Sequence, residues 1–142
     1  MGGVHWREGD ENVKDWWWST MDEKEFKSYK RDIIRKMKAV GTYNKSFEHS
    51  IDVLAKTLVD YKKAVELHEK TGGNLLVKHT NKNGSTNLVK HPLYLAIEKL
   101  RDDILAYSRE LGLTPSGLKR IKDEVGESKQ QSPLEKILSE MS

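Results

Sequence analysis

Residues 76–92 read LVKHTNKNGSTNLVKHP, and this stretch decides the fold. The tetrapeptide Leu-Val-Lys-His stands in it twice, at 76–79 and at 88–91, with Asn83-Gly84 between the two copies. Asn-Gly between two apolar segments is the strongest short signal for a β-hairpin. We therefore predict a two-stranded hairpin at about residues 75–91. A ribbon this short is marginal alone, so it needs support from the helices or from a neighbouring chain.

Two helices with matching apolar spacing are expected on either side of the hairpin. One runs from about residue 44 to 70 and the other from Pro92 to about 111, each with an apolar residue every three or four positions. This spacing is a heptad seam, and two such seams joined by a hairpin predict an antiparallel helical pair. The residues expected to form the core, or contacts between subunits, are Leu54, Leu58, Tyr61, Leu100, Ile104 and Tyr107.

Capping signals predict three further helices. One begins after Thr20 and ends at Gly41, one covers Pro115 to about Val125, and a short one begins at Ser132-Pro133. The fold class is therefore mainly α with one short β-hairpin. The predicted divisions are an N-terminal arm at 1–19, a helical core at 20–126, and a linker with a C-terminal amphipathic segment at 127–142.

Composition limits the classes of function. The 142 residues suit one domain with a modest core, and the complete lack of cysteine excludes disulfides, thiol nucleophiles and cysteine-type zinc sites. No apolar run reaches the ~18 residues of a membrane span, and the N-terminus has no secretion signal. The arm carries Trp16-Trp17-Trp18, which we interpret as a tether to the domain or to a neighbouring subunit.

One face of the first helix is basic. At 100° per residue, five cations fall within roughly 80° of one another, opposite the apolar stripe. They are Lys24, Lys27, Arg31, Arg35 and Lys38. A one-sided line of cations suits contact with phosphates, although an ordinary solvated face has the same appearance. Lys119 and Arg120, next to Lys122, form a second and smaller cluster.

Signatures of catalysis are missing from the sequence. It has no Gly-rich loop followed by Lys and Ser or Thr, and no pair of carboxylates stands out from the solvated acids. His79 and His91 could approach each other across the hairpin, but two imidazoles alone make a poor metal site. His68 is expected to be a packed, hydrogen-bonded residue. We expect no enzyme activity, no cofactor and no metal.

A family resemblance lies in residues 90–121. The Pro-led helix that starts His91-Pro92 is followed by ELGLTPSGLKRI at 110–121. This resembles the small subunit of bacteriophage terminases, whose hallmark is a Leu-Gly-Leu-Thr-Pro-Ser turn. The order of elements is also similar, so the resemblance covers roughly residues 20–125. The family often has Asn where His91 stands and a small polar residue where Gly117 stands.

The resemblance implies a function. Small terminase subunits are non-enzymatic proteins that assemble into rings, bind double-stranded viral DNA at the packaging-initiation site, and recruit and regulate the large subunit with its ATPase and nuclease. They work in the host cytoplasm and not at a membrane. From the residues we add a hypothesis that the C-terminal segment binds the large subunit through its apolar face, formed by Leu134, Ile137, Leu138 and Met141.

Two other functions remain open from the sequence. The turn also resembles a helix-turn-helix, which would make the chain a transcription regulator of a phage or mobile element that reads the major groove through Ser116, Lys119 and Arg120. Gly117 counts against a recognition helix there, because Gly lowers helix propensity. The third interpretation is a protein-binding helical adaptor that does not contact nucleic acid.

Overall fold

The structure, a computed structural model, describes residues 20–129 and 132–141. It is mainly helical with one β-hairpin, as predicted. In chain order the elements are α2 (Thr20–Val40), the 3-10 turn η1 (Lys45–Phe47), α3 (Glu48–Lys70), β1 (Leu76–Thr80), β2 (Thr86–Lys90), α4 (Pro92–Glu110), α5 (Pro115–Lys129) and α6 (Pro133–Glu140). The N-terminal arm with its three tryptophans lies outside the described residues.

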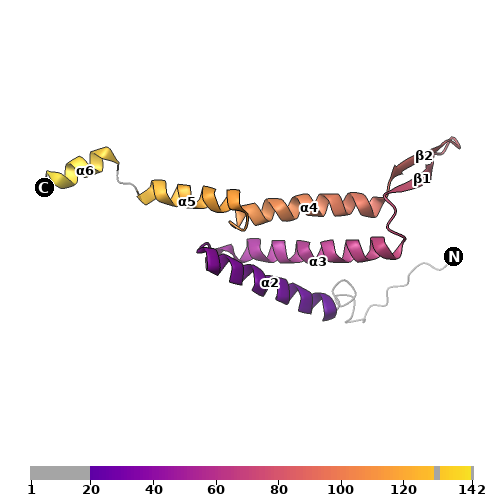
Figure 1. Cartoon of the computed structure of the whole chain (residues 1–142), viewed down its shortest axis with the longest axis horizontal. Helices are drawn as coiled ribbons and strands as arrows, with labels where there is room; N and C mark the ends of the chain where they lie inside the picture. Colours follow the sequence, from indigo (N-terminus) through magenta and orange to yellow (C-terminus); the bar gives the residue numbers. More distant parts are fainter. Residues whose placement is uncertain (1–19, 130–131, 142) are drawn as a thin grey trace, which may run out of the picture.

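Helix α3 is the centre of the molecule. Helix α4 runs antiparallel beside it, which confirms the predicted helical pair, and α2 packs along another side of α3 (Figure 1). Glycines end these helices where the sequence predicts, because Gly41 (φ +80°) and Gly112 (φ +72°) take the left-handed conformation that other residues avoid. The described helices include none that is long and apolar enough to cross a membrane.

The core lies where α2, α3 and the end of α4 meet. Ile33 and Met37 of α2 are buried against α3, with Leu111 beside them. Ala55 and Val59 are also buried, although they lie off the predicted heptad seam of α3. The reason is that α3 has neighbours on two sides, so its buried arc is wider than a single seam.

The six predicted core residues are not equally buried. Leu54 is fully enclosed, and Leu58 and Ile104 pack against the core cluster. Tyr61 and Leu100 are half-buried on the facing helices α3 and α4, whereas Tyr107 is exposed. The chain's own core therefore already contains Leu54, Leu58 and Ile104.

The hairpin has the predicted position and a five-pair antiparallel register from Leu76 opposite Lys90 to Thr80 opposite Thr86. The backbone N–H of Gly84 donates to the Asn81 carbonyl (2.9 Å), and Asn81 N–H donates to the Ser85 carbonyl (2.8 Å). Gly84 has φ +84°. This is the three-residue loop that joins a tight turn to a left-handed glycine, so the glycine of the Asn-Gly signal is required by its backbone conformation.

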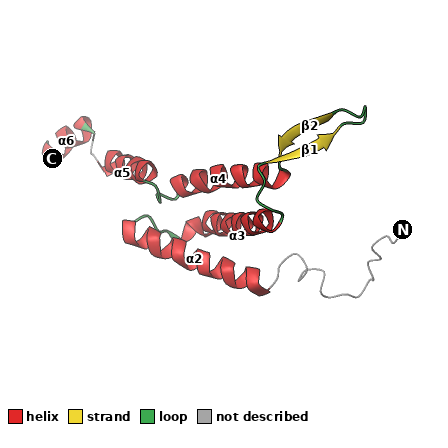
Figure 2. Ribbon diagram, turned by 45° about the vertical axis from the view of Figure 1, so that its right-hand side comes forward, coloured by secondary structure: helices red, strands yellow, loops and turns green. Residues whose placement is uncertain are grey.

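The strands do not pack on the helices of their own chain. The hairpin projects beyond the end of the helical body (Figures 1 and 2), and every strand residue except Val77 is exposed. Lys90 forms the side-chain link to α4, because its Nζ lies 3.1 Å from a Glu98 carboxylate oxygen and over the ring of Tyr94. The ribbon was expected to need support from the helices or from a neighbouring chain, and the helices contact it only at its base.

The predicted approach of His79 to His91 is wrong. The register sets His79 opposite Asn87, and His91 instead meets His68 edge to face, with ring centroids 5.1 Å apart. His91 lies beyond the last strand pair and caps α4, where its Nδ1 accepts a hydrogen bond from the N–H of Leu93. His68 is buried, with its Nε2 2.7 Å from the carbonyl oxygen of Asn74, which confirms the packed role expected for it.

Helix α5 is longer than predicted. It continues past Val125 to Lys129, so the first residues of the segment 127–142, which were expected to be linker, are helical. One glycine inside a helix costs only about 1 kcal/mol, and the polar residues after Gly126 are compatible with helix. The predicted start of α6 is confirmed by a reciprocal capping box between Ser132 and Glu135. Together α5 and α6 form the end of the molecule opposite the hairpin (Figure 1).

Candidate nucleic-acid interface

The predicted basic stripe lies on the outer face of α2. Its five cations are exposed while Ile33 and Met37 of the same helix are buried, so the stripe lies opposite the core as the spacing requires. The side chains of Lys27 and Arg35 keep 66% and 76% of their accessible surface. The stripe is defined here as Lys24, Lys27, Arg31, Arg35 and Lys38.

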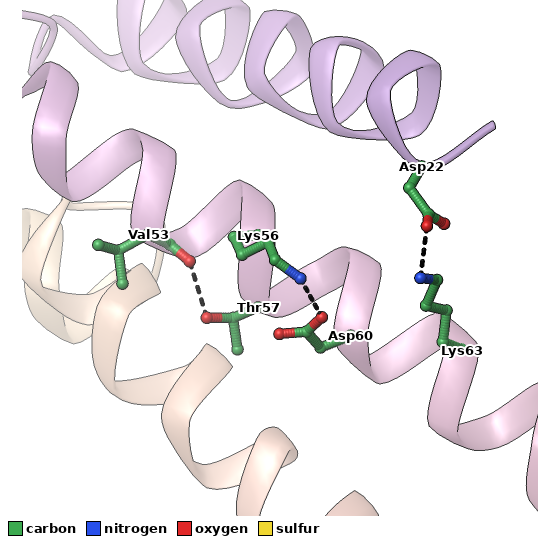
Figure 3. A network of polar contacts seen from close by, with 6 residues as sticks. All are labelled: Asp22, Val53, Lys56, Thr57, Asp60 and Lys63. Carbon is green, nitrogen blue, oxygen red and sulfur yellow. Dashed lines mark hydrogen bonds and ion pairs between the residues drawn. The ribbon is translucent and has the colours of Figure 1, made fainter. Parts of the chain in front are cut away.

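Two of the four described acids of α2 point away from the stripe and toward α3. Asp22, which is buried, forms an ion pair with Lys63 (Figure 3), and Glu25 pairs with Lys62. Because these carboxylates are engaged at the α2–α3 contact, they do not neutralise the outer face. The sequence pattern did not reveal these partners, since ion pairs between helices depend on how the helices cross.

Lys30 also forms an ion pair between α2 and α3, but here α2 supplies the cation and α3 the carboxylate. Its Nζ lies 2.8 Å from Oδ1 of Asp52 on α3, and this hydrogen bond raises the pKa of Lys30 above its ordinary value. Lys30 therefore stays protonated and belongs to the α2–α3 contact. This position explains why it is not part of the stripe although it lies on the same helix.

The two remaining acids lie beside the stripe. Glu23 is 3.0 Å from Lys27, and Asp32 pairs with both Lys36 (2.6 Å) and Arg35. Hydrogen bonds from Lys36 and Arg35 lower the pKa of Asp32, so it is ionised at neutral pH. Exposed pairs within one helix contribute only a few tenths of a kcal/mol, so a phosphate can displace them at little cost.

The other stripe residues have fewer neighbouring carboxylates that would compete with a phosphate for their charge. Lys24 and Arg31 form no ion pair with any residue in the described part of the chain. Lys38 lies over the ring of Tyr43, with its Nζ 5.0 Å from the ring centroid. The stripe as a whole is an exposed cationic surface, and its charges are not locked inside the fold.

The two cations of the second predicted cluster, Lys119 and Arg120, differ in their surroundings. Lys119 is exposed on α5, but Arg120 lies between Glu110 (3.4 Å) and Glu124 (3.6 Å). The charge of Arg120 is therefore balanced by its neighbours. This cluster is a weaker candidate for phosphate contact than the stripe on α2.

The Thr-Pro-Ser turn joins α4 to α5. Thr114 caps α5 as predicted, because its Oγ1 accepts a hydrogen bond from the N–H of Gly117 (3.1 Å). A Cβ at Gly117 would lie 2.2 Å from the carbonyl oxygen of Arg109, so only glycine fits there. Sequence reasoning missed this requirement, since it arises from the backbone of a different helix.

The direction of α5 separates this turn from a helix-turn-helix. In that motif the two helices cross at roughly 90–120°. Here α5 continues approximately along the line of α4, as Figures 1 and 2 both show. The geometry does not present α5 as a recognition helix held across a supporting helix.

The apolar face of α6 is uncovered. Its residues keep between 53% and 79% of their accessible surface, and the members are Leu134, Ile137, Leu138 and Met141. An apolar groove of about 650 Å³ lies elsewhere, next to the Thr-Pro-Ser turn, and is lined in part by Ile33, Leu58, Leu113 and Leu118. No sequence pattern indicated this groove, because its lining residues come from four helices, α2, α3, α4 and α5.

The chemistry that these residues support is binding. In the described part of the chain no three His, Asp or Glu side chains are grouped so that they could hold a metal ion. The stripe offers lysine and arginine donors to a polyanion, and α6 offers an apolar face to a protein.

These features define a helical interaction protein with a cationic face, a Pro-led helix pair and a Thr-Pro-Ser turn. The family model described as phage terminase, small subunit, matches residues 27–128. The chain therefore belongs to the phage terminase small-subunit family. No curated protein and no solved structure gives a significant match.

Proposed function

We propose that this chain binds double-stranded viral DNA at the packaging-initiation site, assembles into a homo-oligomeric ring, and recruits and regulates the large terminase subunit. It acts without catalysis of its own, in the host cytoplasm. Membership of the family supports this role. The single observation that carries the DNA-binding part is the stripe of five exposed cations on α2.

The dimensions of the stripe suit a duplex. Lys24 and Lys38 are fourteen residues apart, which is about 21 Å along a helix axis. Successive stripe residues are three or four positions apart, or about 4.5–6 Å along the helix axis, so several phosphates of one duplex can be contacted together. Each phosphate neutralised by a lysine or arginine releases counterions, so binding through the stripe depends strongly on salt.

The terminal helix is the proposed contact with the large subunit. Helix α6 has only eight residues, and a helix of this length is unstable alone in water. Its capping box favours the helix, and its apolar face would be buried if α6 entered a groove of the partner. Helix α6 lies at the end of the molecule opposite the hairpin, with its apolar residues exposed (Figure 1).

The outer side of α4 supports assembly into a ring. Leu95 and Leu105 keep 49% and 51% of their surface and lie off the buried face of α4, whereas the exposed Tyr107 lies on the flank beside His49 and Val53. A protein contact is marked by exposed apolar residues that gather into one patch, whereas single ones occur on any surface. Of the six residues predicted for core or subunit contacts, Tyr107 is the one that remains available to a neighbour.

Reversing the charge of the stripe tests DNA binding. The variant carries Lys27→Glu, Arg31→Glu and Arg35→Glu, and binding to a phage DNA duplex is measured by fluorescence anisotropy over a range of salt concentrations. We expect weaker binding and a plot of log affinity against log salt that is flatter by about 2.7, which is about 0.9 for each lost phosphate contact.

A matched control variant has the same change in net charge as the stripe variant. It carries Lys45→Glu, Lys70→Glu and Lys136→Glu, three exposed lysines off the stripe. This control is expected to change binding much less. If the stripe variant binds DNA like the unmodified protein, the stripe is not the DNA interface.

A further inference from the structure

The outer part of the hairpin has an unusual composition. Residues 78–87 read KHTNKNGSTN, and all ten are exposed. None of them is acidic and none is aliphatic or aromatic apart from the imidazole of His79. Extending the segment in both directions, the chain has no Asp or Glu between Glu69 and Glu98. The side chains of residues 78–87 therefore carry only positive charge and hydrogen-bonding groups.

The side chains of this segment, defined here as the hairpin tip, are arranged on both faces of the ribbon. The register sets Lys78 on the same face as Thr80 and Thr86, whose hydroxyl oxygens are 3.1 Å apart, while His79 and Asn87 share the other face. Lys78 and Lys82 form no ion pair with any described residue. Their charges are therefore available to a partner.

The shape of the hairpin suits a nucleic-acid groove. A five-residue strand is about 17 Å long, and two paired strands are about 4.8 Å apart. The major groove of B-DNA is about 12 Å wide and admits a two-stranded ribbon. The tip projects beyond the helical body on the α4 side, whereas α2 lies on the other side of α3 (Figures 1 and 2), so the tip is clear of the helices and would contact a duplex separately from the stripe.

We propose that the hairpin tip is a second nucleic-acid contact, which enters a groove of the duplex and places Lys78 and Lys82 against the phosphates. The inference rests on the proposed DNA binding by this chain and adds a site to it. Serine, threonine and asparagine at the tip donate and accept hydrogen bonds, which suits sugar, phosphate and base edges.

Composition favours nucleic acid over protein as the partner of the tip. The centre of a protein interface is built around aromatic, aliphatic and arginine side chains. The tip has none of these. The exposed apolar residues of the strands are Leu76, Leu88 and Val89, of which Leu88 lies opposite Lys78 at the boundary of the tip and the other two lie nearer the base.

The test is the double variant Lys78→Ala, Lys82→Ala, studied as the full chain with the same duplex and salt series as the stripe variant. We expect the slope of log affinity against log salt to flatten by about 1.8, and affinity at 0.1 M salt to fall roughly 10- to 60-fold. The matched control is Lys45→Ala, Lys136→Ala, which removes two exposed lysines elsewhere. Circular dichroism confirms that each variant keeps its helices.

A second measurement reports on the same residues in the unmodified protein. Acetylation of surface lysines is followed by mass spectrometry with and without DNA, and we expect DNA to protect Lys78 and Lys82 at least fivefold more than Lys45. If both lysines react equally in the two conditions, the proposal is wrong.

The outcomes separate the two proposals. If the hairpin variant binds DNA normally while the stripe variant does not, the tip inference fails and the proposed function stands. If the hairpin variant changes only the mass of the assembly, the tip is a protein contact and the inference is overturned. If the unmodified protein has no salt-dependent affinity for DNA, both proposals fall.

Discussion

At the scale of single residues, Gly117 connects the family's turn to the packing of two helices. It is the third residue of α5, and the carbonyl oxygen of Arg109 occupies the space that a Cβ would need. This contact brings the start of α5 against the end of α4. The direction of α5, and with it the position of α6, therefore depends on a residue without a Cβ at position 117.

We expect Gly117→Ala to destabilise the protein by about 2 kcal/mol or more. Alanine is the better helix former by about 1 kcal/mol, but the 2.2 Å approach to Arg109 forces the backbone to shift. The measurement is the free energy of unfolding in urea. Gly126→Ala is the matched control, because nothing lies within 4 Å of its Cβ position, and it should stabilise α5 by about 0.5–1 kcal/mol. Equal effects of the two substitutions would contradict this explanation.

The sequence revealed part of this turn and not the rest. Thr114 and Pro115 are recognisable as a cap and a first-turn residue, because capping depends on neighbours within the same segment. The need for glycine at 117 depends on a carbonyl eight residues earlier in another helix. For the same reason the ion pairs of Asp22, Glu25 and Lys30 with α3 could not be read from spacing alone.

At the scale of elements, local signals predicted the helices and strands well. The hairpin, its glycine, and the starts of α4, α5 and α6 follow from caps and turns that act within a few residues. The buried arc of α3 was underestimated, because a helix with neighbours on two sides buries more than one heptad seam. The predicted end of α5 is too early because the residues after Val125 are polar and resemble a linker, although the helix continues through them to Lys129.

Helix α6 is an element whose role can be tested by removing it. A chain that ends after Lys129 keeps α5 whole and loses the proposed contact with the large subunit. We expect binding of the large subunit, measured by calorimetry, to be lost, and the mass of the assembly by light scattering to stay the same. Retention of normal affinity would place the contact elsewhere.

A point variant refines the same test. Ile137→Asp places a charge on the apolar face of α6, whereas Lys136→Asp changes the neighbouring polar side. We expect the first to weaken large-subunit binding at least tenfold and the second to have little effect. Similar losses from both would indicate that charge, and not apolar burial, governs the contact.

At the scale of the whole molecule, the helical body exposes apolar surface that the residues described by the structure do not cover. Leu105 on α4 and Leu67 on α3 each keep 51% of their surface, but they lie on different helices. The proposed ring uses the outer side of α4. The hairpin also lacks packing support from the described helices, which is compatible with the proposed assembly on DNA.

We expect Leu105→Asp to reduce the mass of the assembly and Leu67→Asp to leave it unchanged. A charge in the middle of a subunit contact costs desolvation energy that apolar packing can no longer offset. Native mass spectrometry or light scattering at a fixed concentration gives the mass of each variant. If the Leu105 variant retains the mass of the unmodified protein, the outer side of α4 is not a subunit interface.

The two extremities of the molecule differ in chemistry, since the cationic hairpin tip stands at one and the apolar α6 at the other (Figure 1). Rotation about a cyclic axis never turns a subunit upside down. If that axis runs across the long direction of each subunit, the extremities form an inner and an outer rim, and if it runs parallel, they form a top and a bottom. In both arrangements the proposed ring would carry all copies of α6 on one rim or face and all hairpin tips on the other, so a large subunit bound through α6 would lie away from DNA held at the tips.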